Sequence, residues 1–194
     1  MTKIENRFFF ILVLSMAFVV SLSNYLVQFP IKQMGLEDFF TYGAFSYPVA
    51  FLITDLTNRK YGKIIARKIV YVGFILGLGL TLFFSTDFSN IISKRIALGS
   101  GSAFLIAQLL DVQVFDKLRE KTWFIAPLVS SLVGSTVDTF LFFSISFYGT
   151  GINWVTLSIG DLFVKILVAI VMLIPFRFLI LRVNEFKIEK KISV

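Results

Sequence analysis

The stretch from Phe45 to Lys68 reads FSYPVAFLITDLTNRKYGKIIARK, and it decides how the rest of the chain is arranged. Its first half is an apolar membrane segment, and its second half is rich in lysine and arginine. Asp55 stands where the apolar half ends, and a carboxylate at the edge of a hydrocarbon layer is costly unless it has a partner or a function. Basic residues beside an apolar segment favour the cytoplasmic side. This stretch therefore supplies both a candidate binding group and an orientation signal.

The composition of the whole chain indicates an all-α integral membrane protein. Of the 194 residues, 57% are hydrophobic and 16% are charged, whereas a soluble domain carries about 25% charged residues. The net charge of +7 does not indicate nucleic acid as a partner, because the basic residues lie in short loops between apolar blocks. Cysteine and histidine are both absent, which removes disulfides, the usual zinc ligand and the commonest general base. We therefore expect no metal, no cofactor and no enzyme activity.

A single domain of six transmembrane helices is predicted. The expected spans are residues 8–29, 39–56, 64–85, 96–115, 124–148 and 155–181. The second span is short, polar and broken by Pro48, a pattern typical of a helix inside a bundle beside a cavity. In the third span Gly73, Gly77 and Gly79 favour close packing against a neighbouring helix. The charged tail, residues 182–194, is expected to fray or to lie on the lipid surface.

The lysines and arginines predict the orientation of these spans. Six spans place both termini on one side, and fifteen basic residues fall on that side against three on the other. Such a bias places both termini in the cytoplasm of a protein that crosses the lipid bilayer several times. The sequence is also compatible with a homo-oligomer.

Polar residues within the spans are the candidate substrate-binding groups. An ionisable side chain that faces lipid at mid-depth costs about 2.5–3.5 kcal/mol, so these residues should face inward and find partners. The candidates are Asn24, Asp55, Arg59, Gln108, Asp111, Asp138, Asp161 and Lys165.

Two pairs among the candidates have a structural alternative. Asp161 and Lys165 are four residues apart with the acid first, the favourable order for a helical ion pair. They either fix the last helix to the bundle or belong to the path of a substrate or proton. Asp55 and Arg59 have the same spacing, so they form either a salt bridge at the interface or part of a site.

Asp138 is the strongest single candidate, because it lies near the middle of its span without a basic neighbour in sequence. A cavity lined by carboxylates, amides and aromatic rings suits a small, flat solute that carries hydrogen-bond donors. Asn24 and Gln108 either line such a cavity or join helices by hydrogen bonds. No nucleotide-hydrolysing motif is present, so transport would be passive, coupled to protons or powered by partner subunits.

Several motifs resemble the queuosine-precursor transporters, also called the vitamin uptake transporter family. The motifs are Ser23–Gln28 (SNYLVQ), Tyr42–Ser46 (YGAFS), Thr54–Arg59 (TDLTNR), Leu109–Phe115 (LLDVQVF), Trp123–Pro127 (WFIAP), Asp138–Thr139 and Phe163–Lys165 (FVK). The resemblance implies a multi-pass importer in the bacterial inner membrane for 7-deazaguanine precursors of queuosine, such as preQ0 and preQ1. It also implies a fold similar to the substrate-binding components of energy-coupling-factor transporters. Two positions depart from the pattern, since Ser135 stands where relatives often have an amide and Gln113 where a histidine can occur.

The chemistry of a deazaguanine fits these residues. Its N1–H and 2-amino group are paired donors that one carboxylate can accept, and we assign Asp138 to them. Asn24 or Gln108 would then meet the carbonyl. Two other functions remain open: a binding subunit that needs separate energising proteins, and an intramembrane aspartyl hydrolase that uses Asp111 and Asp138.

Overall fold

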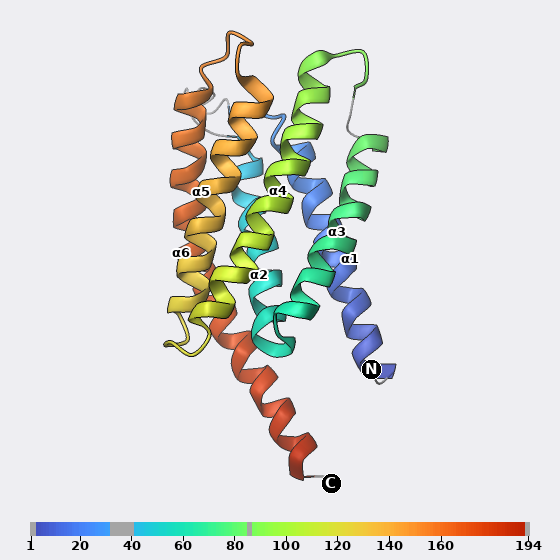
Figure 1. Cartoon of the computed structure of the whole chain (residues 1–194), viewed down its shortest axis with the longest axis vertical. Coiled ribbons are helices and arrows are strands. Elements are labelled where there is room, and N and C mark those ends of the chain that lie inside the picture. The colour runs from blue at the N-terminus through green and yellow to red at the C-terminus, as the bar shows by residue number, and fades with distance from the viewer. Residues whose placement is uncertain (1–2, 32–40, 85–86, 193–194) are drawn as a thin grey trace.

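The computed structural model describes residues 3–31, 41–84 and 87–192, and the side chains of residues 7–31, 41–84 and 87–181. Within these ranges the chain forms six α-helices and no strand. The helices are α1 (Lys3–Leu26), α2 (Gly43–Tyr61), α3 (Lys63–Phe84), α4 (Ile91–Leu118), α5 (Ile125–Phe147) and α6 (Trp154–Ile192). They run side by side along one axis (Figure 1). The prediction of an all-α membrane protein with six helices is confirmed.

Five of the six described helices are long and apolar enough to cross a membrane, and α2 is the exception. The second predicted span, which corresponds to α2, is therefore a more polar helix than expected for a lipid-facing segment. The reason lies in its position, because α2 contacts all five of the other helices. Its polar residues, among them Thr54, Asp55 and Asn58, are buried in protein and do not meet lipid.

The helix ends differ from the predicted spans in ways that local contacts explain. The second predicted span was 39–56, but α2 continues to Tyr61, because the buried Thr57 and Asn58 extend its inward face. Residues 39 and 40 and residue 85, at the edges of two predicted spans, lie outside the described residues. α4 begins five residues earlier than predicted, since the Asn90 side chain caps it by accepting from the backbone N–H of Ile92 at 2.8 Å. The sequence predicted that the tail from residue 182 frays or lies on the lipid surface, whereas the backbone of α6 remains helical to Ile192.

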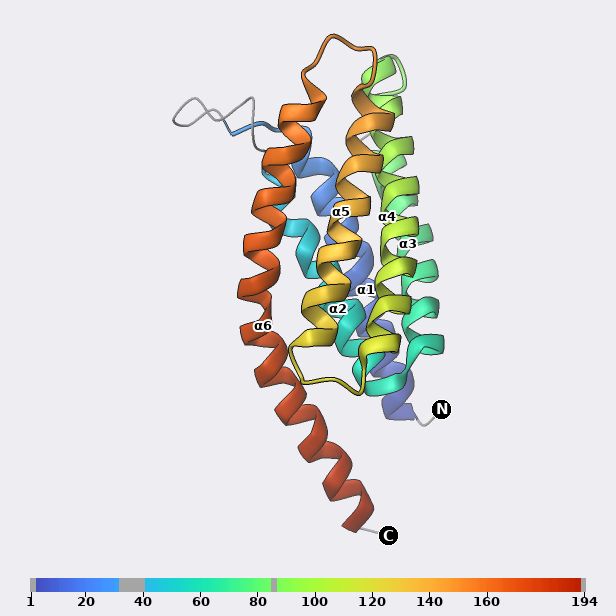
Figure 2. The same ribbon diagram turned by 60° about the vertical axis from the view of Figure 1, so that its left-hand side comes forward.

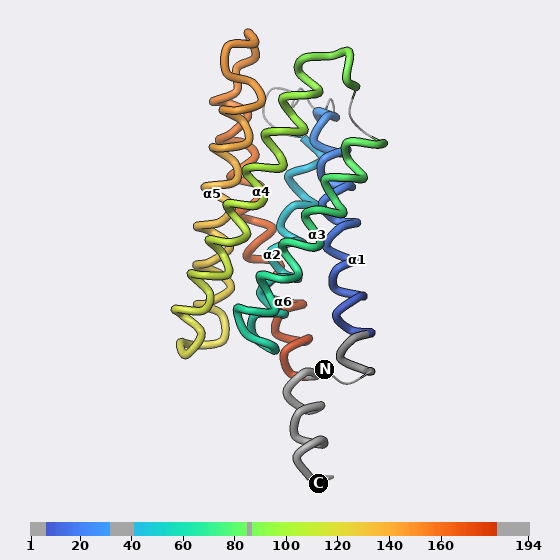
Figure 3. The backbone as a smooth tube through the Cα atoms, turned by 45° about the vertical axis from the view of Figure 1, so that its right-hand side comes forward, coloured from blue at the N-terminus to red at the C-terminus, as the bar shows by residue number. Residues whose placement is uncertain are grey.

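Small residues let α1 and α3 approach closely, as the sequence predicted. A Cβ atom on Gly77 would lie 2.9 Å from the Val20 side chain, and one on Gly73 would lie 2.5 Å from Met16. Gly79, by contrast, has no atom within 4 Å of such a position, so it takes no part in this contact. The most extensive contact in the described bundle is between α4 and α5, which lie side by side in Figures 2 and 3.

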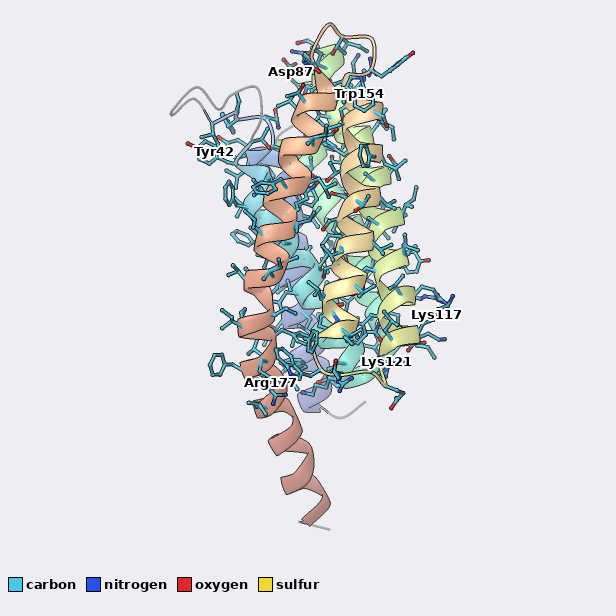
Figure 4. The ribbon with its side chains drawn as sticks, turned by 90° about the vertical axis from the view of Figure 1, so that its left-hand side faces the viewer. Tyr42, Asp87, Lys117, Lys121, Trp154 and Arg177 are labelled. Atoms are coloured by element: carbon cyan, nitrogen blue, oxygen red, sulfur yellow. The ribbon has the colours of Figure 1, made fainter. Side chains whose placement is uncertain are left out.

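The two ends of the bundle differ in charge. The beginning of α1 and the end of α6 lie at the same end (Figure 1), and Figure 4 shows Lys117, Lys121 and Arg177 at that end. Trp154 and Asp87 lie at the opposite end. This arrangement agrees with the charge bias in the sequence, and the cytoplasmic location of the basic end stays a prediction.

Candidate functional site

Polar side chains are concentrated in the interior of this apolar bundle. Seven of the eight predicted candidates are no more than 2% exposed, namely Asn24, Asp55, Gln108, Asp111, Asp138, Asp161 and Lys165. Burial at this level requires hydrogen-bond or ion-pair partners, because an unpaired polar group in hydrocarbon is costly. Six of the seven fall in two clusters and a bridge between them, and the seventh, Asn24, is linked to one cluster through Tyr47.

The first cluster, called here the lysine cluster, consists of Lys165, Asp138, Asp161 and Thr139. The Lys165 Nζ lies 2.9 Å from an Asp138 oxygen and 2.6 Å from an Asp161 oxygen. Thr139 accepts from Lys165 at 3.1 Å and donates to Asp161 at 2.8 Å. The predicted ion pair between Asp161 and Lys165 is therefore confirmed, and Asp138 joins it from α5. One ammonium group thus holds two carboxylates, which leaves the cluster with a net negative charge if both are ionised.

A chain of contacts connects the lysine cluster to α1 and α3. The Lys165 ammonium lies 4.9 Å from the centre of the Tyr47 ring on α2. The Tyr47 hydroxyl donates to the Asn24 carbonyl oxygen at 2.5 Å, and the Asn24 amide nitrogen donates to Thr81 at 3.0 Å. Both ends of the Asn24 amide are therefore occupied. Asn24 joins helices in this structure, which was one of its two predicted roles.

The second cluster, called here the acid pair, consists of Asp55 on α2 and Asp111 on α4. The two carboxyl groups are close neighbours, and Ser130 lies against both. Ser130 and Ser131 donate to the two Asp55 oxygens at 3.2 Å and 3.3 Å. Neither Asp111 oxygen accepts a hydrogen bond from a described residue. The Ser130 hydroxyl has one proton to donate, and the Pro127 backbone carbonyl lies 3.3 Å from it as a second acceptor.

Between the two clusters lie Gln108 and Ser135, which have unused hydrogen-bonding capacity. The Gln108 carbonyl oxygen accepts from Thr54 at 2.5 Å, whereas its amide nitrogen has no partner among the described residues. The buried Ser135 hydroxyl is likewise unpaired within the described part of the chain. Ser135 precedes Asp138 by three residues, so the two lie on one face of α5.

Arg59 is the one candidate that is not buried in this polar interior. Its guanidinium donates to the Arg119 backbone carbonyl at 2.6 Å, at the basic end of the bundle. Asp55 instead accepts hydrogen bonds from two serines. The salt bridge between Asp55 and Arg59, which the sequence offered as one alternative, is therefore not formed. Arg119 in turn donates to Asn58 at 2.6 Å and pairs with Asp116 at 2.9 Å. These contacts tie the ends of α2 and α4 together.

Sequence reasoning did not single out Tyr47, Thr139, Ser130 and Ser131 as partners of the candidates. The helical spacing could have found some of them. Thr139 follows Asp138 directly, and Ser131 precedes Ser135 by one turn of α5. Tyr47 could not be assigned without the structure, because its contact with Lys165 depends on how α2 and α6 pack.

The bundle has one cavity at its Trp154 end and a smaller one beside Asp55. One has a volume of about 380 Å³, and its lining includes Val27, Ile96 and Phe147 at the end of the bundle near Trp154. The other has a volume of about 10 Å³ and is bounded by Asp55, Ser131 and residues of α6. Neither of these two cavities is lined by Asp138 or Asp111. Among the described residues no group of three or more acidic side chains is arranged to hold a metal ion.

Comparison with known proteins identifies relatives over most of the chain. Residues 41–180 match the family described as "Putative vitamin uptake transporter". The chain is 36% identical to the "Queuosine precursor transporter" of Escherichia coli, a match that covers 81% of this chain and 79% of that protein. It is 34% identical to the "Probable queuosine precursor transporter" of Haemophilus influenzae, over 91% of this chain and 87% of the relative.

A third relative, the "Probable queuosine precursor transporter" of Bacillus subtilis, is 32% identical over 69% of this chain and 68% of that protein. No solved structure matches the chain, so the expected likeness to energy-coupling-factor components stays a prediction. The matched region contains all the candidate residues except Asn24. With its bacterial relatives and its apolar helices, the chain is a multi-pass bacterial membrane protein, and it belongs to the vitamin uptake transporter family.

Proposed function

We propose that this chain imports queuosine precursors, 7-deazaguanines such as preQ0 and preQ1, across the bacterial inner membrane. The names of the relatives support this function, because three bacterial proteins similar to most of the chain are named as transporters of queuosine precursors. The buried polar groups of the bundle support it independently, since they suit a small, flat heterocycle.

The observation that carries the proposal is the set of unused hydrogen-bonding atoms on α4 and α5. The Gln108 amide nitrogen is a donor without an acceptor, and the Ser135 hydroxyl has no partner among the described residues. Asp138, on the same face of α5 as Ser135, accepts from Lys165 through one carboxylate oxygen, Oδ2. Buried polar atoms of this kind are normally satisfied, so unpaired ones on facing helices favour a ligand.

These atoms match the edge of a guanine-like ring. The ring carbonyl is an acceptor, which the Gln108 amide can serve, and the N1–H and 2-amino groups are donors, which Asp138 can accept. Gln108 is preferred over Asn24 for the carbonyl, because both ends of the Asn24 amide are already bonded. Lys165 positions Asp138 and offsets its charge, and Asp161 binds the same ammonium group and so helps to hold Lys165 in place.

Two aromatic rings stand beside the proposed site. Phe51 of α2 packs on Gly134, which directly precedes Ser135, and a Cβ atom on Gly134 would lie 2.5 Å from the Phe51 ring. Tyr47 is one helical turn from Phe51 and contacts Lys165. Stacking of a heterocycle on an aromatic face contributes roughly 1–3 kcal/mol per base in other proteins, so the two rings are suited to hold the substrate plane.

The cavity of about 380 Å³ at the Trp154 end is the proposed entrance, and its volume is in the range of small-molecule sites. Phe147 lines this cavity and packs with Phe142 and Phe143 in one apolar cluster. Phe142 is one turn from Asp138, so the phenylalanines separate the entrance from the lysine cluster. Transport would require these rings to move aside and α2 to open toward the basic end.

The deciding experiment measures queuosine in the tRNA of a strain that cannot synthesise precursors. Cells with and without this gene would be supplied with preQ0 or preQ1. We expect queuosine-modified tRNA at low external precursor only in cells that carry the gene. Equal queuosine content in both strains with either precursor would reject the proposed function.

A binding subunit that depends on energising partners is the second candidate. Reconstitution of the purified protein into liposomes separates the two, because a self-sufficient carrier exchanges labelled precursor without partners. The hydrolase alternative required Asp111 and Asp138 to act together, but Asp138 bonds Lys165 while Asp111 neighbours Asp55. The relatives are named as transporters, and no catalytic role is proposed for either acid.

A further inference from the structure

Asp55 and Asp111 form a contact between two acids that the substrate site does not use. Their exposed fractions are 2% and 0%, and they connect α2 to α4. Two serine hydroxyls satisfy Asp55, but both oxygens of Asp111 remain without a donor from any described residue. Asp111 is thus an unpartnered, fully buried carboxyl group placed against a second carboxyl group.

The cations of the described structure are engaged elsewhere or lie outside the bundle. Around the acid pair, Lys165 of α6 bonds Asp138 and Asp161 of the lysine cluster, and Arg59 of α2 bonds a backbone carbonyl. The other cations on these helices also lie away from the pair. Lys63 of α3 and Arg119 pair with Asp116 of α4, Arg67 of α3 bonds Gln113, and Arg95 of α4 bonds two backbone carbonyls of residues 145 and 148. Lys60 of α2 lies over the Phe8 and Tyr61 rings, and Arg177 of α6 lies over Trp123. Arg7, Lys68 and Lys117 are exposed, and Lys94 is in the first turn of α4, at the other end of that helix from Asp111. The acid pair therefore has no counter-charge within these residues.

Binding of one proton supplies the hydrogen-bond donor that the acid pair lacks and removes the repulsion between its two carboxylates. Two ionised carboxylates offer only acceptors, so they cannot bond to each other, and their repulsion in a buried site is costly. One proton converts either acid into a donor and supplies the hydrogen bond that Asp111 lacks. A hydrated metal ion does not fit, because the cavity beside Asp55 is about 10 Å³, the space of a single water.

We propose that the acid pair is a proton-binding site that couples precursor import to inward proton movement. The proposal rests on the proposed function and adds its energy source. In each cycle the pair takes one proton from the outer solution and releases it to the cytoplasm, and no other reactant is needed. Protonation holds α2 and α4 together, whereas release of the proton leaves two like charges in contact and favours their separation.

A hydrogen bond beside the acid pair connects this pair to the proposed substrate site. Thr54, next to Asp55, donates to the carbonyl oxygen of Gln108, which precedes Asp111 by three residues. Substrate bound to the Gln108 amide nitrogen therefore affects the same contact between α2 and α4 that protonation of the acid pair stabilises. The two ligands bias one structural element, which is the physical requirement for coupling.

The test uses purified protein in liposomes with labelled preQ0 and a pH gradient that is acidic outside. Valinomycin with equal potassium on both sides holds the membrane potential at zero. With one proton per neutral substrate, wild-type protein should accumulate preQ0 about tenfold for each pH unit, and a protonophore should abolish the accumulation. Adding preQ0 to lightly buffered liposomes should also make the external medium more alkaline, a readout that needs no variant.

Asp55→Asn and Asp111→Asn imitate the protonated acids. Each should lose gradient-driven accumulation and keep exchange of labelled for unlabelled preQ0, because exchange does not require release of the proton. Asp116→Asn, which removes an acid from the partly exposed end of α4, is the matched control and should accumulate preQ0 like wild type.

Three results would overturn the coupling: wild-type exchange without accumulation under the gradient, accumulation by the Asn variants, or folded Asn variants that have lost exchange. The first of these leaves the proposed function intact. Wild-type protein with neither exchange nor uptake would instead reject the proposed function, and the coupling with it.

Discussion

Lys165 on α6 lies 2.9 Å from Asp138 on α5, and both side chains are almost completely buried. This ion pair joins two helices at the depth where substrate binding is proposed. A buried pair is weak evidence for stability, but removal of one partner leaves an uncompensated charge. Replacement of Lys165 should therefore lower the stability of the protein, whereas replacement of Asp138 should lower transport.

Replacement of Lys165 by methionine should destabilise the protein. Asp138 and Asp161 would face each other without a cation, so the free energy of unfolding should fall by about 3–5 kcal/mol. Thermal unfolding of the purified protein in detergent measures the change. Lys63→Met, which breaks a partly exposed pair with Asp116, is the control and should cost no more than about 1 kcal/mol. Equal stability of the two variants would show that the lysine cluster is not charged as described.

Asp138→Asn should abolish most transport while the protein still folds. Lys165 keeps its 2.6 Å contact with Asp161, so no buried charge loses its only partner. The substrate, however, loses hydrogen bonds to a charged acceptor, each of which contributes about 1.5–3 kcal/mol, so initial uptake of labelled precursor should fall at least about tenfold. Uptake at the wild-type rate, at matched expression, would remove Asp138 from the mechanism.

The two amides that the sequence could not distinguish should now behave differently. Gln108→Met removes the unpaired amide donor and should raise the substrate concentration for half-maximal uptake. Asn24→Ala breaks bonds to Tyr47 and Thr81, and such interhelical bonds in membrane proteins contribute about 0.6 kcal/mol on average, so it should mainly lower thermal stability. The assignment fails if Asn24→Ala changes the half-maximal concentration and Gln108→Met does not.

Much of this fold follows from the sequence, because uninterrupted apolar blocks specify five helices and the short polar block specifies α2. Local spacing also predicts the pair of Asp161 and Lys165, since four residues make one turn. The contact between Asp55 and Asp111 could not be predicted in this way. It depends on the rotation of α2 against α4, which the packing of all six helices determines together. The same reason explains why Tyr47 and the paired serines were missed.

Gly134 should be sensitive to the addition of a single methyl group. The Phe51 ring occupies the position where a Cβ atom would lie, so Gly134→Ala must displace the ring or separate α2 from α5. Overpacking of this kind costs about 1–3 kcal/mol, and uptake should fall because Phe51 stands beside the proposed substrate site. Gly79→Ala is the matched control, since open space surrounds it within 4 Å and alanine favours a helix. The argument fails if both variants have wild-type stability and uptake.

The orientation in the membrane can be tested directly, because the natural chain contains no cysteine. Lys121→Cys places a single thiol in the loop between α4 and α5, at the basic end, and Ile152→Cys places one between α5 and α6, near Trp154. Both positions are exposed. If the basic end is cytoplasmic, a membrane-impermeant maleimide should label Ile152→Cys in intact cells and Lys121→Cys only after the membrane is opened. Unmodified protein, which cannot react, gives the background. The reverse labelling pattern would place the large cavity on the cytoplasmic side, and the proposed entrance would then become the exit.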